Sequence, residues 1–200
     1  MKTRPVLDVS ALPLHGHQSQ SVTWWGTLGF MLIEGTGFAL TIAIYIYLQS
    51  IASEWPLSVP PPNLIPGTAT TVVLLVSAWP NVMIGRWAQQ YDLRKVRLGL
   101  LVMTAFGIVP LIIRWFEFKA LNVRWDSNAY GSVVWLLLGL HTTHFVTDLG
   151  DTLILAALMF VRKQPNKRRF GDVQDNALYW HFVVVTWLPI YFVIYILPRL

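Results

Sequence analysis

Cysteine is absent from this 200-residue chain. The chain therefore holds no disulfide, zinc–thiolate, iron–sulfur or thiolate–copper site. Charged residues are also scarce: they make up 12% of the sequence, whereas hydrophobic residues make up 54%. A typical soluble domain carries about 25% charged residues. The sequence also lacks a nucleophile-elbow motif and a glycine-rich phosphate loop. These absences argue against a soluble enzyme and indicate a membrane protein.

Five apolar stretches are each long enough to cross a hydrocarbon core of about 30 Å, which takes roughly 20 helical residues. They lie near 23–51, 67–86, 96–115, 130–161 and 177–197. We therefore predict an all-α membrane protein, in which residues 23–200 form one bundle of five transmembrane helices. Pro80 and Pro110 fall inside predicted spans, where neighbouring helices can satisfy the freed carbonyls, so we expect local kinks and not helix ends.

The first 22 residues form a polar leader with neither an apolar core nor a small-residue cleavage site, so we do not expect a cleavable signal peptide. Lysine and arginine are unevenly divided between the two predicted sides. The side with the leader and the loops 86–97 and 162–169 carries eleven, whereas the other carries four, in 114–129 and at Arg199. The positive-inside rule then predicts a cytoplasmic N-terminus and an outer C-terminus. The same rule explains the net charge of +5 by basic residues in the loops on one side of the membrane. The charge therefore does not indicate nucleic-acid binding.

Ionisable residues inside the predicted spans are the candidate functional residues, because a charge at the bilayer centre costs roughly 3 kcal/mol or more. They are Glu34, His141, His144, Asp148, Asp151 and His181. The four in the fourth span are spaced 3, 4 and 3 apart, which aligns them along one helix face. Glu34 is expected near mid-membrane. His181 is expected near the cytoplasmic boundary, at the level of Asp151.

Three interpretations of these residues remain open. The one we favour is that they hydrogen-bond one another and tie helices together. The second is a proton route or a contact with lipid headgroups. The third is a metal site, since His141 and His144 can both reach one ion, although a lone H-x-x-H pattern is a weak signal. A haem held by two histidines is expected less, because only three histidines lie in the spans.

Four groups of residues resemble, in family order, subunit III of the haem–copper terminal oxidases, the cytochrome c oxidase family. GFMLIE, ending at Glu34, is similar to the third family helix with its buried glutamate. RWFEFK, 114–119, resembles the acidic-aromatic end of the fifth. DSNAYG, 126–131, followed by LHTTH, 140–144, resembles the Y-G-S and G-x-H-x-x-H pattern. YWHFV, 179–183, followed by Trp187, resembles the last helix. The likeness covers nearly the whole chain after residue 22 and indicates the five-helix type.

The resemblance implies a non-redox subunit of a proton-pumping oxidase in the bacterial plasma membrane, used in aerobic respiration. Its expected partners are the catalytic subunit I and subunit II, which hold the haems and copper, so this chain is expected to have no cofactor and no catalytic residue of its own. The resemblance also implies stabilisation of the catalytic subunit, support of proton uptake from the cytoplasm, and structural phospholipids. Glu34, His141, His144 and His181 match internal polar positions of the family, and Arg162 is a candidate contact for a lipid headgroup.

The sequence departs from the family at three carboxylate positions. Val184 stands where the family has aspartate, whereas Asp148 falls where many members have glycine, and Asp151 is unusual. We interpret this as a carboxylate that has moved between helices. Two alternatives stay open within the superfamily, a subunit of a quinol oxidase and the protein that accompanies nitric oxide reductase. A third, from another class, is a proton-coupled carrier that uses the 141–151 stripe, although the internal repeat typical of carriers is not found.

Overall fold

The computed structural model describes residues 22–161 and 166–200, and this part of the chain is helical apart from its loops. The helices are α1 (Val22–Ile51), α2 (Leu64–Gln89), α3 (Leu93–Lys119), α4 (Ala129–Val161) and α5 (Lys167–Tyr191), followed by a π-helix η1 (Phe192–Ile196) and a 3₁₀ turn η2 (Leu197–Arg199). Five helical segments are long and apolar enough to cross a membrane. The prediction of a five-helix membrane bundle is confirmed.

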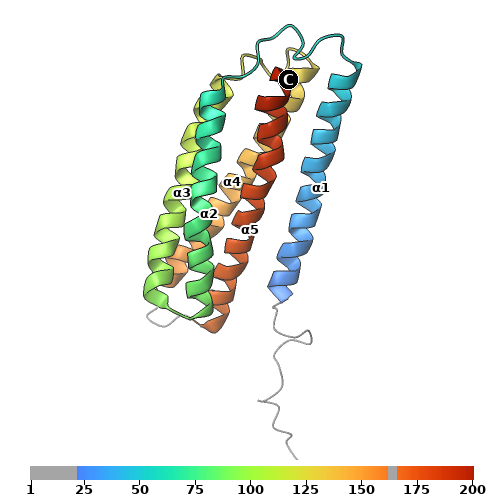
Figure 1. Cartoon of the computed structure of the whole chain (residues 1–200). Helices are drawn as coiled ribbons and strands as arrows, with labels where there is room; N and C mark the ends of the chain where they lie inside the picture. The colour runs from blue at the N-terminus through green and yellow to red at the C-terminus, as the bar shows by residue number, and fades with distance from the viewer. Residues whose placement is uncertain (1–21, 162–165) are drawn as a thin grey trace, which may run out of the picture.

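Four of the helices form a ring, and the fifth lies beside it (Figure 1). Around the ring, α2 packs on α3, α3 on α4, α4 on α5, and α5 on α2. The remaining helix, α1, packs mainly on α4 and α5, at the edge of the bundle. Its start and the C-terminus of the chain lie at opposite ends of the molecule (Figure 1).

Two helices extend beyond their predicted spans. The last one begins at Lys167 and not near residue 177, because Phe170, Val173 and Ala177 form a buried face while the charged residues between them lie outside that face. With η1 and η2 it runs for 33 residues. At a rise of about 1.5 Å per residue this exceeds a 30 Å hydrocarbon core, so its first turns extend past the hydrocarbon.

The third helix also runs further, to Lys119, and Arg114, which we counted among the charges of the outer loop 114–129, lies inside it. That assignment is wrong, because Arg114 is buried inside the bundle with only 1% of its surface exposed. The prediction for the prolines is correct in its main point: Pro80 lies inside α2 and Pro110 inside α3, and both helices continue through them.

The start of α3 is fixed by Asp92, which lies outside the membrane-spanning segments. Its side chain accepts a hydrogen bond from the backbone N–H of Lys95 at 3.2 Å, and its other oxygen lies 2.9 Å from Lys95 Nζ. This is the N-cap arrangement that satisfies an orphan donor in the first turn. The side-chain contact with Lys95 and the hydrogen bond from its backbone lower the pKa of Asp92 below its ordinary value of 3.8.

The end of α1 nearest the C-terminal face is held by a buried group of aromatic rings. Trp55, in the loop after α1, donates its indole N–H to the hydroxyl oxygen of Tyr45 at 2.9 Å. The ring of Trp55 also meets the ring of Tyr130, at the start of α4, edge to face at 5.1 Å between centroids. Both tyrosines are fully buried. These contacts attach one end of α1 to the ring of four helices.

Candidate functional site

The most deeply buried charges form a cluster where α2, α3, α4 and the π-helix η1 meet, which we call the ion-pair cluster (Thr70, Arg114, Glu117, His141 and Tyr195). Arg114 donates from Nη1 to Glu117 Oε2 at 2.8 Å, within α3. The same oxygen accepts the hydroxyl of Thr70 at 3.1 Å, and Glu117 Oε1 accepts the hydroxyl of Tyr195 at 2.6 Å. Every oxygen of the buried carboxylate therefore has a donor, as a charge in a low dielectric requires.

The cluster continues through Arg114 to His141. Nη2 of Arg114 lies 3.1 Å from His141 Nδ1, and His141 Nε2 lies 3.0 Å from the carbonyl oxygen of Val183. A guanidinium only donates, and a carbonyl only accepts, so the contacts assign the neutral tautomer of His141 with its proton on Nε2. The guanidinium also lies over the ring of Trp187 at 4.4 Å. His141 is thus a structural link between three helices.

A second group, which we call the Glu34 cluster (Glu34, His144 and Tyr179), joins α1 to α4 and α5. Tyr179 donates its hydroxyl to Glu34 Oε2 at 2.8 Å. His144 Nε2 lies 3.0 Å from Glu34 Oε1, close enough for an ion pair, although the atoms lack the alignment of a hydrogen bond. The other ring nitrogen of His144 lies 2.6 Å from the carbonyl oxygen of Leu140, so it carries a proton.

The geometry of the Glu34 cluster requires a proton between two side chains. Since two lone pairs facing each other at 3.0 Å repel, the contact between His144 Nε2 and Glu34 Oε1 needs a proton on one of the two atoms. The pair is therefore either an imidazolium beside a carboxylate or a neutral imidazole beside a carboxylic acid.

The predicted polar stripe along α4 is only partly present. His141, His144 and Asp148 are buried, but Asp151 is exposed, and Thr152 takes the inward position beside it. Asp148 Oδ1 accepts from the amide of Asn176 at 3.4 Å, and the carbonyl oxygen of that amide accepts from Thr152 at 3.1 Å. The expectation that Asp151 shares the buried face is wrong.

His181 lies further from the start of the last helix than we expected. Because α5 begins at Lys167, His181 lies about four turns along it. The side-chain amide of Asn81, on α2, donates to the carbonyl oxygen of Ala177 at 2.7 Å and lies 2.5 Å from His181 Nδ1. The residue therefore links α2 to α5. Thr152, next to Asp151, pairs with Asn176, which precedes His181 by more than one helical turn, so His181 is not level with Asp151.

The histidines do not converge on a common point. His141 and His144 have different partners, the first Arg114 and Val183, the second Leu140 and Glu34. A guanidinium beside His141 also repels a cation. Over residues 22–161 and 166–200, no three His, Asp or Glu side chains are grouped in a way that could hold a metal ion. Arg162, the candidate headgroup contact, lies outside the residues that the structure describes.

The ion-pair cluster is the part of the site that sequence reasoning missed. Arg114 and Glu117 were noted only as parts of a motif, and Arg114 was counted as a loop charge. The available signal was their spacing, since opposite charges three residues apart lie on the same helix face. Tyr195 and Thr70 carried no signal of their own, because hydroxyl-bearing residues are common in membrane helices.

Comparisons with known proteins place the whole chain. The family model described as cytochrome c oxidase subunit III matches residues 50–198. The chain is 27% identical to "Cytochrome c oxidase subunit 3" of Thermostichus vulcanus over 187 residues, which cover 92% of each chain. It is 26% identical to the protein of that name from Synechocystis sp., over 92% of this chain and 79% of the relative. It is 28% identical to "Probable cytochrome c oxidase subunit 3" of Mycobacterium tuberculosis, over 85% of each.

Proposed function

The chain belongs to the cytochrome c oxidase subunit III family, and from this membership we propose that it is a non-redox subunit of a proton-pumping haem–copper terminal oxidase. The observation that carries the proposal is the family match over residues 50–198, most of the five-helix bundle. In this proposal the O₂ chemistry belongs to the catalytic subunit I, which works with subunit II. Those partners hold the haems and the copper.

The contacts of His141 support the non-redox role. Both of its ring nitrogens are engaged, one by Arg114 and the other by the carbonyl oxygen of Val183. A haem or copper ligand must instead present a free ring nitrogen to the metal. The contribution of this chain is then to stabilise the catalytic subunit, to support proton uptake from the cytoplasm and to bind structural phospholipid, the last with Arg162 as a candidate contact.

The Glu34 cluster is our candidate for the part of the chain that supports proton uptake. It combines a carboxyl group in contact with an imidazole and a place at the edge of the bundle, where the side chain of Glu34 keeps 16% of its surface exposed. From there towards the end of the bundle that carries the basic loops, the next polar groups are Asp148, which is buried, and Asn176, which is half-buried. The residues of the Glu34 cluster also tie α1 to α4 and α5. The cluster therefore has two proposed roles, helix attachment and proton uptake, and they need a test that separates them.

Replacing Glu34 with glutamine separates the two roles. The amide retains an oxygen that accepts the Tyr179 hydroxyl, but it cannot take up a proton. We expect Glu34→Gln to assemble normally and to slow proton uptake by the reconstituted oxidase, measured with a pH-sensitive dye in the vesicle lumen. Tyr179→Phe is the matched control: it keeps the carboxyl group, so uptake stays normal while the attachment of α1 weakens by roughly 1 kcal/mol. Normal proton uptake in Glu34→Gln would show that the cluster ties helices together and has no part in proton uptake.

We further propose a multi-pass protein of the bacterial plasma membrane with its N-terminus in the cytoplasm. The basic residues near the ends of the helices support that orientation by the positive-inside rule, and several curated relatives are bacterial. The relatives carry the name cytochrome c oxidase, which favours cytochrome c as the electron donor over a quinol.

The proposal is tested by isolating the tagged chain from its own membranes in mild detergent. We expect haem absorption bands, a co-purifying catalytic subunit, and oxidation of reduced cytochrome c by the eluate. Oxidation of quinol alone would reassign the complex to the quinol oxidases. A colourless chain that elutes alone and moves protons or a solute across liposomes would replace the subunit by a carrier.

A further inference from the structure

The last helix carries a polar side chain, His181, inside its most apolar stretch. Residues 176–198 hold no Lys, Arg, Asp or Glu. At a rise of about 1.5 Å per residue this stretch is about 34 Å long, close to the hydrocarbon thickness of about 30 Å. His181 is the sixth residue of the stretch, so it lies within the hydrocarbon, in the half nearer the basic loops.

One ring nitrogen of His181 has partners inside the bundle, and the other has none among the described residues. Nδ1 lies 2.5 Å from the side-chain amide nitrogen of Asn81 and 2.8 Å from the carbonyl oxygen of Ala177. Nε2 makes no hydrogen bond over residues 22–161 and 166–200, and it is not among their fully buried polar atoms. The contacts of Nδ1 hold the ring in place, so Nε2 stays open to the surface of the bundle.

Other polar side chains on the outer surface are satisfied within their own helices. The exposed hydroxyls of Thr36 and Thr143 donate to the carbonyl oxygens four residues earlier, at 2.8 and 3.0 Å. The imidazole Nε2 of His181 has no such acceptor or donor on α5. Lipid chains offer no hydrogen bond, and an unsatisfied polar group in hydrocarbon costs several kcal/mol. The atom therefore needs a partner from outside the described bundle.

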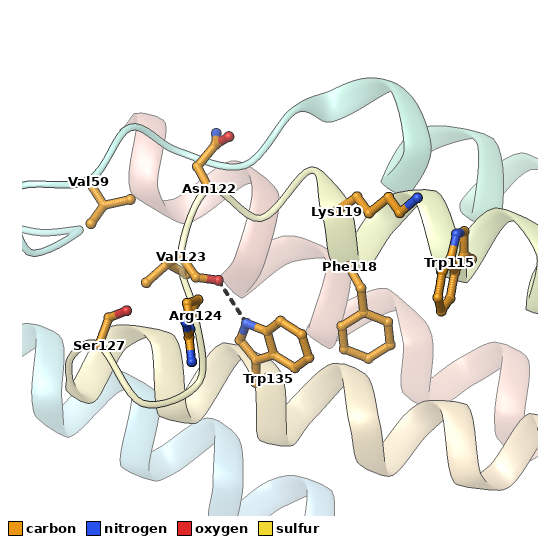
Figure 2. Close-up of a pocket in the computed structure, with 9 residues that line it drawn as sticks. All are labelled: Val59, Trp115, Phe118, Lys119, Asn122, Val123, Arg124, Ser127 and Trp135. Carbon is orange, nitrogen blue, oxygen red and sulfur yellow. Dashed lines mark hydrogen bonds between the residues drawn. The ribbon is translucent and has the colours of Figure 1, made fainter.

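The pocket at the C-terminal end of the bundle has no comparable group (Figure 2). It has a volume of about 580 Å³ and lies where α3 ends and α4 begins. Trp135 donates its indole N–H to the carbonyl oxygen of Val123 at 2.8 Å, and Arg124 binds Asp126. Lys119 is exposed at the end of α3, where water solvates its ammonium. These polar groups need no partner helix.

The neighbours of His181 form an apolar outer face on α5, which lies between α2 and α1 (Figure 1). Leu178, His181, Val185 and Leu188 are spaced 3, 4 and 3 apart, so they share one side of the helix. We call them the His181 face. Leu178 is half-buried, whereas Val185 and Leu188 are 62% and 44% exposed. Spacings that alternate between three and four are those with which two helices pack side by side.

We propose that the His181 face is the docking surface for a transmembrane helix of another subunit of the complex. That helix is apolar apart from one side chain, an amide, hydroxyl or carboxyl group, which hydrogen-bonds Nε2 of His181. The apolar neighbours supply the packing, and the imidazole fixes the register of the two helices. The inference rests on the proposed oxidase role, which supplies the complex, and it adds the surface that binds the partner.

The test is a site-specific cross-link in native membranes. The photoreactive residue p-benzoylphenylalanine is incorporated in place of Val185 in the full tagged chain, and the membranes are illuminated before solubilisation. We expect a cross-link to a transmembrane helix of another subunit, within about one turn of a hydrogen-bonding side chain. The matched control places the same residue at Leu101, which is 53% exposed on α3 between the apolar residues Leu98 and Val102. This position should cross-link to lipid.

Variants of His181 separate its outer contact from its inner one. His181→Asn keeps a polar atom near the position of Nδ1 but has none at Nε2. We expect it to lower the cross-link yield from position 185 about three- to tenfold, the range for an interhelical hydrogen bond. Thermal unfolding of the isolated chain should stay unchanged. His181→Gln, whose amide reaches the position of Nε2, should restore part of the yield.

Cross-links from position 185 only to lipid, or to a second copy of this chain, would overturn the proposal, and this result does not depend on a His181 variant folding. An unchanged yield in His181→Asn would also overturn it. A co-purifying catalytic subunit with cross-links only to lipid would refute the docking surface and keep the oxidase role. A cross-link to a helix of another subunit in a complex without haem would keep the surface and refute the oxidase role.

Discussion

At the scale of single residues, the main feature is that two opposite charges lie inside the bundle with almost no contact with the membrane or water. Arg114 and Glu117 are 1% and 0% exposed. A buried pair of this kind need not stabilise a fold by itself, because desolvation offsets much of the attraction. Breaking it is costly, however, since the remaining charge is left buried without its partner.

Arg114→Met should therefore destabilise the chain by about 3–5 kcal/mol. The comparison variant is Arg124→Gln, which breaks the exposed pair with Asp126 and should cost no more than about 1 kcal/mol. The measurement is the free energy of unfolding from SDS titration in mixed micelles. Similar losses in the two variants would show that burial of Arg114 has no energetic consequence.

A second residue-scale prediction concerns the pair as a unit. Arg114→Met/Glu117→Gln removes both charges, so its loss of stability should be smaller than the sum of the two single losses. The expected coupling is about 0.5–3 kcal/mol, the range for residues in one polar network. Additive losses in the same titration would mean that Thr70, His141 and Tyr195 hold each charge independently.

Sequence reasoning identified the residues of the site better than their pairing. Glu34, His141, His144 and Asp148 were singled out because charges interrupt apolar runs, a signal that is strong in membrane proteins. The partners were not predictable, since Tyr179 lies 145 residues from Glu34 in sequence and nothing local specifies the contact. Arg114 was misplaced because a hydropathy window treats any charge near the end of a span as the start of a loop.

At the scale of helices, small residues decide how closely elements approach. A methyl group added at Gly67 on α2 would come within 2.6 Å of the Tyr195 ring, whose hydroxyl binds Glu117. The same group at Gly37 on α1 would meet nothing within 4 Å. The first glycine therefore permits a close packing of α2 on the π-helix η1, and the second has no such role.

Gly67→Ala should destabilise the chain by about 1–3 kcal/mol, because it pushes a buried ring off its partner. Gly37→Ala should be neutral or stabilising by up to about 1 kcal/mol, since alanine favours the helix. Thermal unfolding of the detergent-solubilised chain distinguishes the two. A loss in Gly37→Ala equal to that in Gly67→Ala would point to backbone effects and not to the contact with Tyr195.

The start of α3 should depend on pH through its cap. The folded pKa of Asp92 is lowered, so its contribution is present above the ordinary value of 3.8 and is lost as the pH falls through the lower folded value. Amide exchange at residues 93–96 should accelerate in that acid range. In Asp92→Asn, which can still cap the helix, the acceleration should disappear. An unchanged pH profile would show that another group controls this helix end.

The number of helices was predictable, whereas two of their ends were not. Length and hydropathy identify segments that cross a membrane, and these were found correctly. The start of α5 was not predicted because residues 167–176 are polar on average, although Phe170 and Val173 form a buried face. A helix that extends past the hydrocarbon is stabilised by one apolar face, which average hydropathy does not register.

At the scale of the whole molecule, α1 is the least integrated element. It packs mainly on α4 and α5, and Leu32, Ile33 and Leu40 are between 61% and 75% exposed on its outer surface. Its attachments include the Glu34 cluster in its first half, the ring contacts of Phe38 near its middle, and those of Tyr45 near its end. Its outer face is accordingly available to lipid or to a partner subunit.

The orientation in the membrane can be tested in the cysteine-free chain without any background labelling. Ser53→Cys lies in the loop after α1 and Gln89→Cys at the end of α2, and both positions are exposed. A membrane-impermeant maleimide applied to intact spheroplasts should label Ser53→Cys at once, but Gln89→Cys only after lysis. The reverse pattern would invert the predicted topology.

The ion-pair cluster also has a consequence for the order in which the protein is made. Arg114 and Glu117 leave the ribosome together on one helix, so they can enter the bilayer as a neutral pair before their other partners exist. Tyr195 follows 78 residues later and supplies the last donor to Glu117. Since the N-terminal parts of a chain emerge first, the Glu117 carboxylate lacks the Tyr195 donor until that residue has been synthesised. The ion-pair cluster can therefore be completed only after residue 195 has been synthesised.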